Sequence, residues 1–301
     1  MSKKNLIILQ IVLWSCIIVF LTGIFVYASF MNHEEMTIAL TGKGHELNYE
    51  VPLENMNEIE VDLVSQDIYI YETDEPVLIV KQVANRNIPE DEKLRLVQYE
   101  HKVKVEKKNN VGFKVFNFGN WSFNERVEIY VPTTYKQLLN LKTVSGTIKM
   151  NNLIVDEIEC QTTSGDIEII NVAAKEMKIN TTSGDIKVED IEIDSLKGVS
   201  TSGDLEIEGI CNNVEGKTVS GNIELELMQH PEQIRVESVS GDIDLTFDKM
   251  NGFDLEFNST SGDFESDFDV IAKSKKQYSY KDESAKLRVK TVSGDLEINK
   301  K

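Results

Sequence analysis

The stretch that decides the fold runs from Glu157 to Val188 and reads EIECQTTSGDIEIINVAAKEMKINTTSGDIKV. It contains the string TTSGDI twice, beginning at Thr162 and at Thr181, so that the second copy follows the first after 19 residues. On both sides of each string apolar and polar residues alternate, which is the period of a β-strand with one buried face. The unit is therefore strand, turn, strand, and a short connection such as NVAAK leads into the next unit.

The same unit recurs through the second half of the chain. Its Ser-Gly pairs begin at Ser145, Ser164, Ser183, Ser202, Ser220, Ser240, Ser261 and Ser293, with steps of 19, 19, 19, 18, 20, 21 and 32 residues. A fixed period near 20 residues is typical of a solenoid, in which each repeat stacks on the previous one. Strands this short gain a core only by stacking, about 4.8 Å apart. The sequence predicts an all-β fold, a parallel β-solenoid of about 19-residue coils over residues 138–301.

The Ser-Gly-Asp triplets are expected to form the turn of each coil. The best-kept triplets are Ser164, Gly165, Asp166, then Ser183, Gly184, Asp185, then Ser202, Gly203, Asp204. Glycine suits such a turn because it adopts positive φ without a steric penalty. The residue after each glycine is the strongest candidate for chemistry, since in-register carboxylates would repeat about every 5 Å along the coils.

Two interpretations of this acidic row are open. A calcium ladder would use Asp166, Asp185, Asp204, Asp242, Asp263 and Asp295 as oxygen ligands. A structural turn would use the same side chains to accept backbone N–H groups nearby. Thr147 and Asn222 take the same place in two coils and keep an acceptor oxygen without a charge. The shared property is therefore hydrogen bonding, and the sequence favours the turn.

The first 30 residues have a different character. Residues 1–5 form a short stub with Lys3 and Lys4, and residues 6–30 contain no charged side chain. Twenty-five helical residues extend about 37 Å, which is enough to cross a bilayer core of about 30 Å. The lysines predict a cytoplasmic amino end, with everything after Phe30 outside the cell membrane. A cleaved signal peptide is the alternative, but its apolar region is normally shorter.

Composition indicates which partners to expect. The chain has 32 Lys and Arg against 51 Asp and Glu, a formal net charge of −19. Nucleic acid is excluded as a partner because phosphate binding needs clustered cations. Envelope polymers or membrane proteins remain as possible partners. Cys160 and Cys211 lie at different phases of their coils and are not expected to form a disulfide. No metal-binding, nucleotide-binding or nucleophile motif occurs, so the sequence predicts no cofactor and no enzyme activity.

Two regions lie outside the regular repeat. Residues 31–45 read as a linker and residues 46–137 as a β-rich cap over the open end of the solenoid. Within that cap Ser65-Gln66-Asp67 resembles a degenerate form of the later turn, which suggests a divergent first coil. An aromatic cluster follows, with Phe116, Phe118, Trp121 and Phe123. It is interpreted as the apolar plug of the cap, with a partner-binding surface as the alternative.

A polar insert over residues 266–285 lengthens the seventh coil. Its lysines are compatible with folding over the final coil or with contact to an anionic polymer, and a solvated loop is the favoured interpretation. Lys300 and Lys301 follow the last strand and are expected to protect an exposed edge at the end of the solenoid.

The string VEIYVPTTYKQLLNLKTVSGTIKM, from Val127 to Met150, followed by recurring T-[TV]-S-G-D-[IL], resembles the putative-adhesin family of bacterial β-repeat proteins. With one amino-terminal anchor the chain is similar to its LiaG-type members, which are encoded with envelope-stress systems in low-GC Gram-positive bacteria. The resemblance covers roughly residues 50–301 and implies the fold. It carries over no catalytic residue.

The function expected from these features is a non-catalytic interaction or scaffold module, tethered to the membrane and facing the envelope. The alternatives are a calcium-dependent adhesin and a carbohydrate-active enzyme built on a β-helix.

Overall fold

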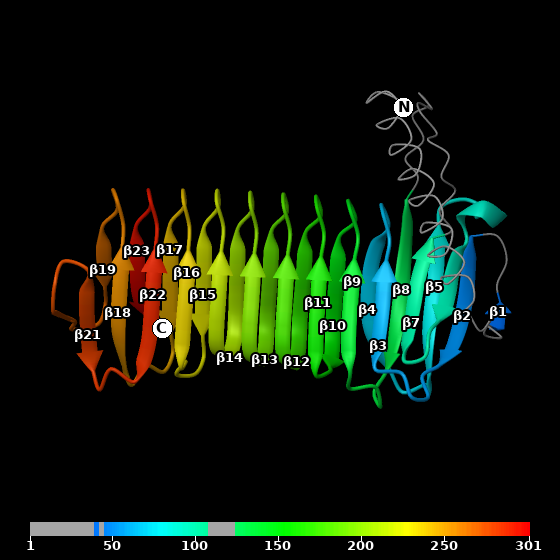
Figure 1. Ribbon diagram of the computed structural model, residues 1–301, viewed down its shortest axis with the longest axis horizontal. Coiled ribbons are helices and arrows are strands. Elements are labelled where there is room, and N and C mark those ends of the chain that lie inside the picture. The colour runs from blue at the N-terminus through cyan, green and yellow to red at the C-terminus, as the bar shows by residue number, and fades with distance from the viewer. Residues whose placement is uncertain (1–38, 42–44, 108–123) are drawn as a thin grey trace, which may run out of the picture.

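The computed structural model describes residues 39–41, 45–107 and 124–301. These form an elongated rod of β-strands (Figure 1) with one short 3-10 helix at Glu90–Glu92. The strands are β1 Ala39–Thr41, β2 Glu46–Pro52, β3 Glu58–Asp62, β4 Asp67–Thr73, β5 Val77–Ala84, β6 Leu94–Gln98, β7 Lys102–Lys107, β8 Glu125–Pro132, β9 Leu138–Lys142, β10 Ile148–Ile154, β11 Glu157–Gln161, β12 Ile167–Asn180, β13 Ile186–Val199, β14 Leu205–Lys217, β15 Ile223–Leu227, β16 Gln233–Glu237, β17 Ile243–Phe247, β18 Gly252–Asn258, β19 Phe264–Ser266, β20 Ile271–Ala272, β21 Gln277–Lys281, β22 Ala285–Lys290 and β23 Leu296–Lys300. The predicted all-β, mostly parallel repeat is confirmed.

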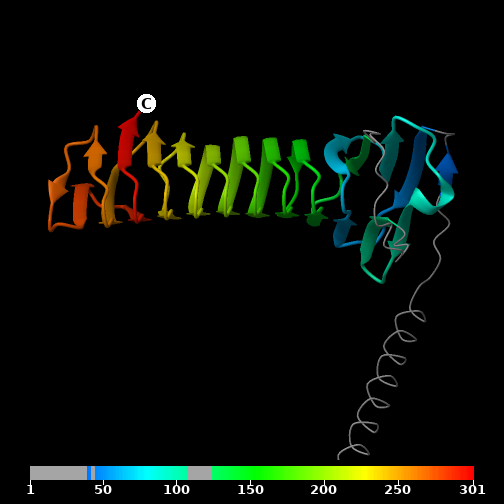
Figure 2. The same ribbon diagram turned by 90° about the horizontal axis from the view of Figure 1, so that it is seen from above.

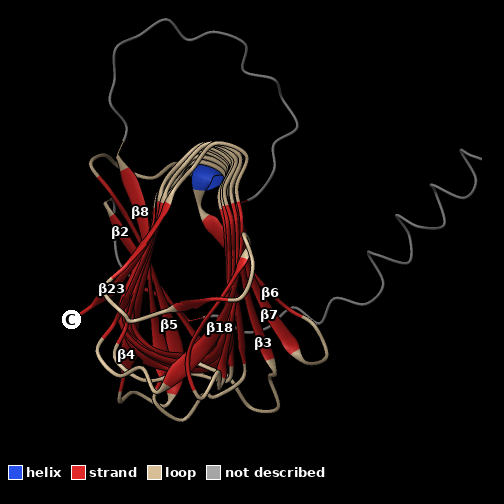
Figure 3. Ribbon diagram, turned by 90° about the vertical axis from the view of Figure 1, so that its left-hand side faces the viewer, coloured by secondary structure: helices blue, strands red, loops and turns tan. Residues whose placement is uncertain are grey.

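Each coil contributes one strand before its turn and one strand after it. The strands before the turns stack in parallel into a first sheet, for example β9, β11 and the second half of β12. The strands after the turns stack into a second sheet, for example β10 and the first half of β12. Seen along the rod (Figure 3), the two sheets face each other and the turns close them at the top.

A third, narrow face closes the middle coils on the side opposite the turns. There β12, β13 and β14 run on without interruption, so that each belongs to the second sheet at its start and to the first sheet at its end. Asn152, Asn171 and Asp190 turn the corner with φ of 54°, 55° and 53°. Asn and Asp tolerate this left-handed conformation better than other non-glycine residues. A sharp corner is therefore built without breaking the strand.

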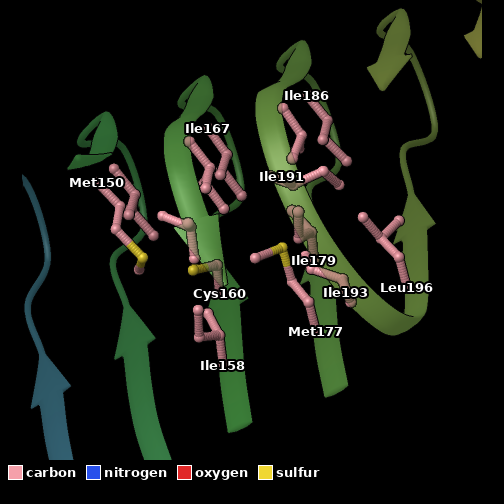
Figure 4. Close-up of a cluster of buried hydrophobic side chains, with 14 of the residues drawn as sticks. Met150, Ile158, Cys160, Ile167, Met177, Ile179, Ile186, Ile191, Ile193 and Leu196 are labelled. Atoms are coloured by element: carbon pink, nitrogen blue, oxygen red, sulfur yellow. The ribbon is translucent and has the colours of Figure 1, made fainter. Parts of the chain in front are cut away.

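The core lies between the two sheets and is aliphatic. Ile167, Ile169 and Ile179 are fully buried, and Met150, Ile158 and Met177 pack around them (Figure 4). Corresponding residues of neighbouring coils are register partners, as are Ile148, Ile167 and Ile186. Each coil therefore buries its apolar face against copies of the same face, which is the source of stability in a solenoid.

At the amino-terminal end the expected cap contains two further coils. The strands β3 and β4 form a coil that stacks directly on β9 and β10. The strands β7 and β8 form the next coil outward, because β7 pairs with β3 and β8 with β4. Ser65-Gln66-Asp67 is the turn of the first of these coils, as its resemblance to the later turns predicted. Only β1, β2, β5 and β6 are antiparallel additions that cover the end.

A buried polar group fastens these additions to the outermost coil. Glu125 is 7 % exposed and accepts hydrogen bonds from Gln66 at 3.0 Å, Gln82 at 2.6 Å and Lys107 at 2.6 Å. Gln82 also accepts the hydroxyl of Tyr49 at 3.3 Å and the N–H of Leu94 at 3.0 Å. The buried carboxylate of Glu125 is thus paired and hydrogen-bonded, as burial requires.

At the carboxy-terminal end the order of the coils differs from their order in the sequence. The last strands, β22 and β23, pair on one side with β16 and β17 and on the other with β18 and β19. The eighth repeat is therefore inserted between the sixth and the seventh, and the chain ends inside the rod (Figures 1 and 2). The expectation that Lys300 and Lys301 protect the end of the solenoid is wrong, because β23 has a neighbour on both sides.

Aromatic residues explain why the seventh repeat is outermost. Its insert returns as β21, which pairs antiparallel with β18. Phe253 contacts Phe268 at 5.8 Å and Tyr280 at 5.6 Å between ring centroids, and Phe264 contacts Tyr278 at 4.6 Å. These rings fill the open end, a role for which the aliphatic eighth repeat is unsuited. Part of the insert thus folds over the outermost coil, which is the seventh repeat and not the final one, whereas the sequence favoured a solvated loop.

Two predictions fall outside the described residues. They are the membrane helix over residues 6–30 and the aromatic cluster of Phe116, Phe118, Trp121 and Phe123. In the part of the chain that the structure describes, no helix has the length and apolar character of a membrane span.

Candidate functional site

The glycines of the Ser-Gly-Asp turns serve close packing between coils. Gly165, Gly184 and Gly203 are buried, and none of them has positive φ. A Cβ built on Gly165 would overlap the backbone carbonyl oxygen of Gly146, and one built on Gly184 would overlap that of Gly165. The expected reason for glycine, left-handed backbone, is therefore wrong. Glycine is needed because the carbonyl of the preceding coil occupies the space of a side chain.

The hydroxyl three residues before each glycine completes this contact. The hydroxyl of Thr181 is buried and donates to the carbonyl of Gly165 at 3.2 Å, and Ser200 donates in the same way to Gly184 at 3.1 Å. The Thr162 hydroxyl also accepts the N–H of Gly165 in its own turn, at 3.2 Å. The motif T-x-S-G-D is thus explained by hydrogen bonds between coils.

The aspartates after the glycines form a ladder. The Oδ1 atom of Asp166 accepts the N–H of Asp185 at 3.0 Å, and that of Asp185 accepts the N–H of Asp204 at 2.9 Å. The ladder continues through Asn222 to Asp242, Asp295 and Asp263 with distances from 2.7 to 3.0 Å. The acceptor role matches the turn interpretation, but the donor belongs to the next coil instead of the same turn.

The six aspartates of the possible calcium ladder are exposed and follow one line along the rod: Asp166, Asp185, Asp204, Asp242, Asp263 and Asp295. Each of them except Asp263 has one carboxylate oxygen engaged by a backbone N–H of the adjacent coil in these bonds. Calcium takes six to eight oxygen ligands. No group of three or more metal-ligating side chains with metal-site geometry occurs among the described residues.

The outer face of the second sheet changes character along the rod. Near the amino-terminal end the rings of Tyr71 and Tyr130 are in tilted contact with centroids 5.4 Å apart, and the Lys81 ammonium lies 4.6 Å from the Tyr130 centroid. Toward the other end Glu224, Asp244 and Glu297 are register partners in successive coils. Burial raises the pKa of Asp244, and the neighbouring carboxylates, with Glu297 first, raise it further. Like charges in register therefore oppose each other here.

The structure also brings His230 to two residues that are close to each other in the sequence, Asp282 and Ser284. His230 Nε2 lies 2.9 Å from the hydroxyl of Ser284, which donates to Asp282 Oδ1 at 2.7 Å. The backbone N–H of Asn251 points to His230 Nδ1 at 3.4 Å. This order differs from a hydrolytic triad, in which the carboxylate contacts the histidine and the histidine takes the serine proton. The group fastens the connection between β21 and β22 to the preceding loops.

The third face carries a hollow that we call the third-face groove. Its centre is a row of register partners from four coils, Ile154, Ala173, Glu192 and Ile210. Hollows of about 450 and 460 Å³ share this row. One extends to the corner with Asn171 and Asp190, and the other to Asp156 and Lys175 on the opposite side. Glu72 lines one end and Met228 the other, so the groove is bounded along the rod.

The groove was not predicted from the sequence. A signal was present in the short residue Ala173 between the larger Ile154 and Glu192, which leaves space at the centre of the row. The exposed Ile154, with 54 % of its surface accessible, was a second signal. Among the described residues, Cys160 and Cys211 are buried and free, and burial raises the pKa of Cys160 to about 12.

Comparison with known proteins adds the family. The model of the family described as Toastrack DUF4097 matches residues 56–299. The chain belongs to the toastrack family. No protein with a curated description matches it.

Two solved structures resemble the toastrack rod described here. A protein of Parabacteroides distasonis, described as a putative lipid binding protein, is 18 % identical, with a TM-score of 0.53, over 86 % of this chain and 98 % of that one. A putative adhesin of Bacteroides fragilis is 13 % identical, with a TM-score of 0.52, over 84 % and 96 %. At this identity both likenesses establish the fold alone.

Proposed function

We propose that this toastrack protein is a non-catalytic interaction or scaffold module at the bacterial cell envelope. In this proposal residues 6–30 anchor it in the cell membrane, and the rod lies on the outer side. We further propose that it acts in the response to envelope stress, which the resemblance to LiaG-type proteins supports. Its partners are envelope polymers or membrane proteins.

The observation that carries the proposal is the in-register stacking of the coils. The interior of the described rod is filled mostly with apolar side chains, and the buried Glu125 is engaged in hydrogen bonds, so we expect contacts with a partner at the surface. On that surface, equivalent side chains recur about every 4.8 Å along the rod. Such rows suit contact with an extended partner, because the same interaction can repeat from coil to coil. The descriptions of the two structural relatives, an adhesin and a lipid binding protein, are in keeping with a binding role.

The alternatives are a calcium-dependent adhesin and a carbohydrate-active enzyme. Calcium binding would be visible as a large rise in the melting temperature of the full chain, because a ligand that binds the folded state stabilises it. Enzyme activity would be visible as release of fragments from purified envelope glycans. Neither result is expected.

Location is tested by fractionating cells that produce the full chain with an epitope tag after Lys301. The expected result is recovery in the membrane fraction and loss of the tag when intact, wall-stripped cells are treated with protease. The matched control lacks residues 6–30 and should appear in the soluble fraction. Protection of the tag from external protease would contradict the proposal.

The interaction role is tested by crosslinking in intact cells. The expected result is recovery of the same envelope component from independent preparations, together with loss of that component when the rod is replaced by an unrelated tagged domain on the same anchor. Recovery of the same set of molecules with the rod and with the unrelated domain would contradict the proposal of a specific scaffold.

A further inference from the structure

The third-face groove combines apolar side chains with acidic ones, since Glu192 stands in its central row and Asp190 and Glu72 lie beside that row. Ile154 is 54 % exposed, and Ile210 and Met228 are partly exposed along the same hollow. Exposed aliphatic groups gathered in a concave surface are a mark of a binding site, whereas single exposed residues are not. The apolar part therefore calls for aliphatic side chains in the occupant.

The carboxylates of the groove are largely uncompensated. Glu72, Asp190 and Glu192 line it without an ion pair anywhere in the described ranges. Asp156 does have a partner, since Lys175 lies 3.0 Å away. On the outer face of the first sheet opposite charges compensate each other, as where Lys102 binds Glu60 at 2.7 Å and Lys197 binds Glu215 at 3.1 Å. An occupant of the groove is therefore expected to carry cationic groups as well.

Other occupants fit less well. An anionic lipid headgroup or a phosphate polymer would meet like charge at Asp190 and Glu192. A sugar chain normally packs on an aromatic ring, and no aromatic side chain is among the described residues that line the groove. A free divalent cation would leave the apolar row unused.

We propose that the third-face groove binds a short cationic, amphipathic peptide segment, in which Lys or Arg alternates with aliphatic residues. Its aliphatic side chains pack over Ala173 between Ile154 and Ile210. The Lys or Arg side chains leave the other face of the extended segment, and their long flexible stems bend back to bring the charges to Glu192 and Asp190. The row spans four coils, about 15 Å from first to last, which matches four to five residues of extended chain. The inference rests on the proposed function and names the chemistry of one partner.

The test is fluorescence anisotropy with a labelled peptide of sequence Lys-Leu-Lys-Val-Lys-Leu and the full chain in a non-ionic detergent. All titrations use one detergent concentration, so that uptake of peptide by micelles is common to them. Glu192→Lys is expected to weaken binding at least tenfold, because it reverses the central charge. Asp190→Asn is expected to weaken it about threefold and to keep the fold, since Asn152 and Asn171 occupy the same corner in neighbouring coils.

Matched controls separate the groove from general attraction to an acidic protein. Glu224→Lys makes the same charge change on the second sheet, and Val64→Ser is compared with Ile154→Ser because both parent residues are 54 % exposed. Both controls should change the affinity less than twofold, whereas Ile154→Ser should weaken binding about fivefold.

Equal weakening by Glu192→Lys and Glu224→Lys would overturn the proposal, as would equal binding of a peptide with Glu in place of Lys. Such a failure would leave the membrane location untouched, because that is measured separately by fractionation and protease access. Circular dichroism on each variant verifies that the β-fold is intact.

Discussion

The backbone N–H of Asp204 donates a hydrogen bond of 2.9 Å to the Oδ1 atom of Asp185 in the preceding coil. The bond joins two turns that are 19 residues apart and is repeated at equivalent positions along the rod. What the turn needs at this place is an acceptor oxygen, and a charge is incidental. Asn222, which accepts the N–H of Asp242 at 3.0 Å, meets the same need without one.

We therefore expect Asp185→Asn to change the free energy of unfolding by less than about 0.5 kcal/mol. Asp185→Ala removes the acceptor and is expected to cost about 1 kcal/mol, the usual value of a hydrogen bond. Denaturant unfolding of the full chain measures both. A larger loss for Asn than for Ala would contradict the ladder as described.

Calcium is expected to leave the melting temperature within about 1 °C at millimolar concentration, because oxygens of the aspartate row already accept backbone hydrogen bonds. Binding at several sites would instead raise it by many degrees through mass action. The same measurement on Asp185→Asn provides the control. If calcium raises the melting temperature of the parent protein, and Asp185→Asn reduces that rise, the calcium ladder would be established.

Gly165→Ala is expected to destabilise the fold by about 3 kcal/mol or more, because the new methyl group overlaps the carbonyl oxygen of Gly146 and backbone cannot yield as a side chain can. Gly198→Ala is the matched control. There the methyl group would meet Cδ1 of Leu205 at 2.8 Å, the end of a side chain that can rotate away. We expect a cost of about 1 kcal/mol for this second variant. Equal losses would show that close packing is not the reason for glycine.

The order of the last coils can be tested by crosslinking. Ser240 and Ser293 are bridge partners in adjacent coils, and cysteines placed at both should oxidise to a disulfide, because register partners lie within disulfide range. Ser261 lies one coil farther from Ser240, so the pair Ser240→Cys and Ser261→Cys should not crosslink. Mobility on a non-reducing gel distinguishes the two. Preferential crosslinking of the second pair would show that the last coils stack in the same order as in the sequence.

Asp244→Asn is expected to stabilise the protein at neutral pH. Because the pKa of Asp244 is raised in the folded state, this state binds the proton more tightly than the unfolded state does. Stability therefore falls as pH rises from the ordinary aspartate pKa, about 4, through the raised value. The gain from Asn should be less than about 1 kcal/mol after solvent screening, should shrink in 1 M salt, and should vanish below pH 4.

Glu215→Gln provides the control of opposite sign. Its hydrogen bond from Lys217 lowers the pKa of the Glu215 carboxyl, with a further contribution from Lys197. Its stabilising effect is present above the ordinary glutamate pKa and is lost as pH falls through the lowered value. Unfolding curves collected between pH 3 and pH 8 measure both variants. A stabilising effect of Glu215→Gln at pH 7 would contradict these assignments.

Much of the fold could be predicted because the strands and turns are encoded by residues that are close together in the sequence. Alternation around Ile167 and Ile169 predicts strands, and the recurrence of Ser-Gly-Asp predicts where they turn. The cover of the amino-terminal end could not be predicted in this way. The place of β2 depends on partners 25 to 37 residues away, and that of β6 on a single antiparallel neighbour.

The reason for glycine in the turns could not be read from the chain. A single strand-turn-strand unit does not show that the carbonyl of Gly146 will lie over Gly165, because that contact exists only after two coils stack. The direction of the Asp185 hydrogen bond has the same origin. The third-face groove needs four coils in register before Ile154, Ala173 and Ile210 share one surface.

The sequence by itself determined the all-β class, the coil length and the position of each turn. It did so because each repeat of about 19 residues contains the same alternating strands and the same turn residues. The tertiary structure alone decided how the coils are ordered at the ends. Each coil offers nearly the same hydrogen-bonding edge to any other, so pairing does not distinguish the seventh repeat from the eighth. The choice falls to packing of Phe253, Phe264 and Phe268 against the returning hairpin, which places the aromatic repeat outermost and β23 between two neighbouring strands.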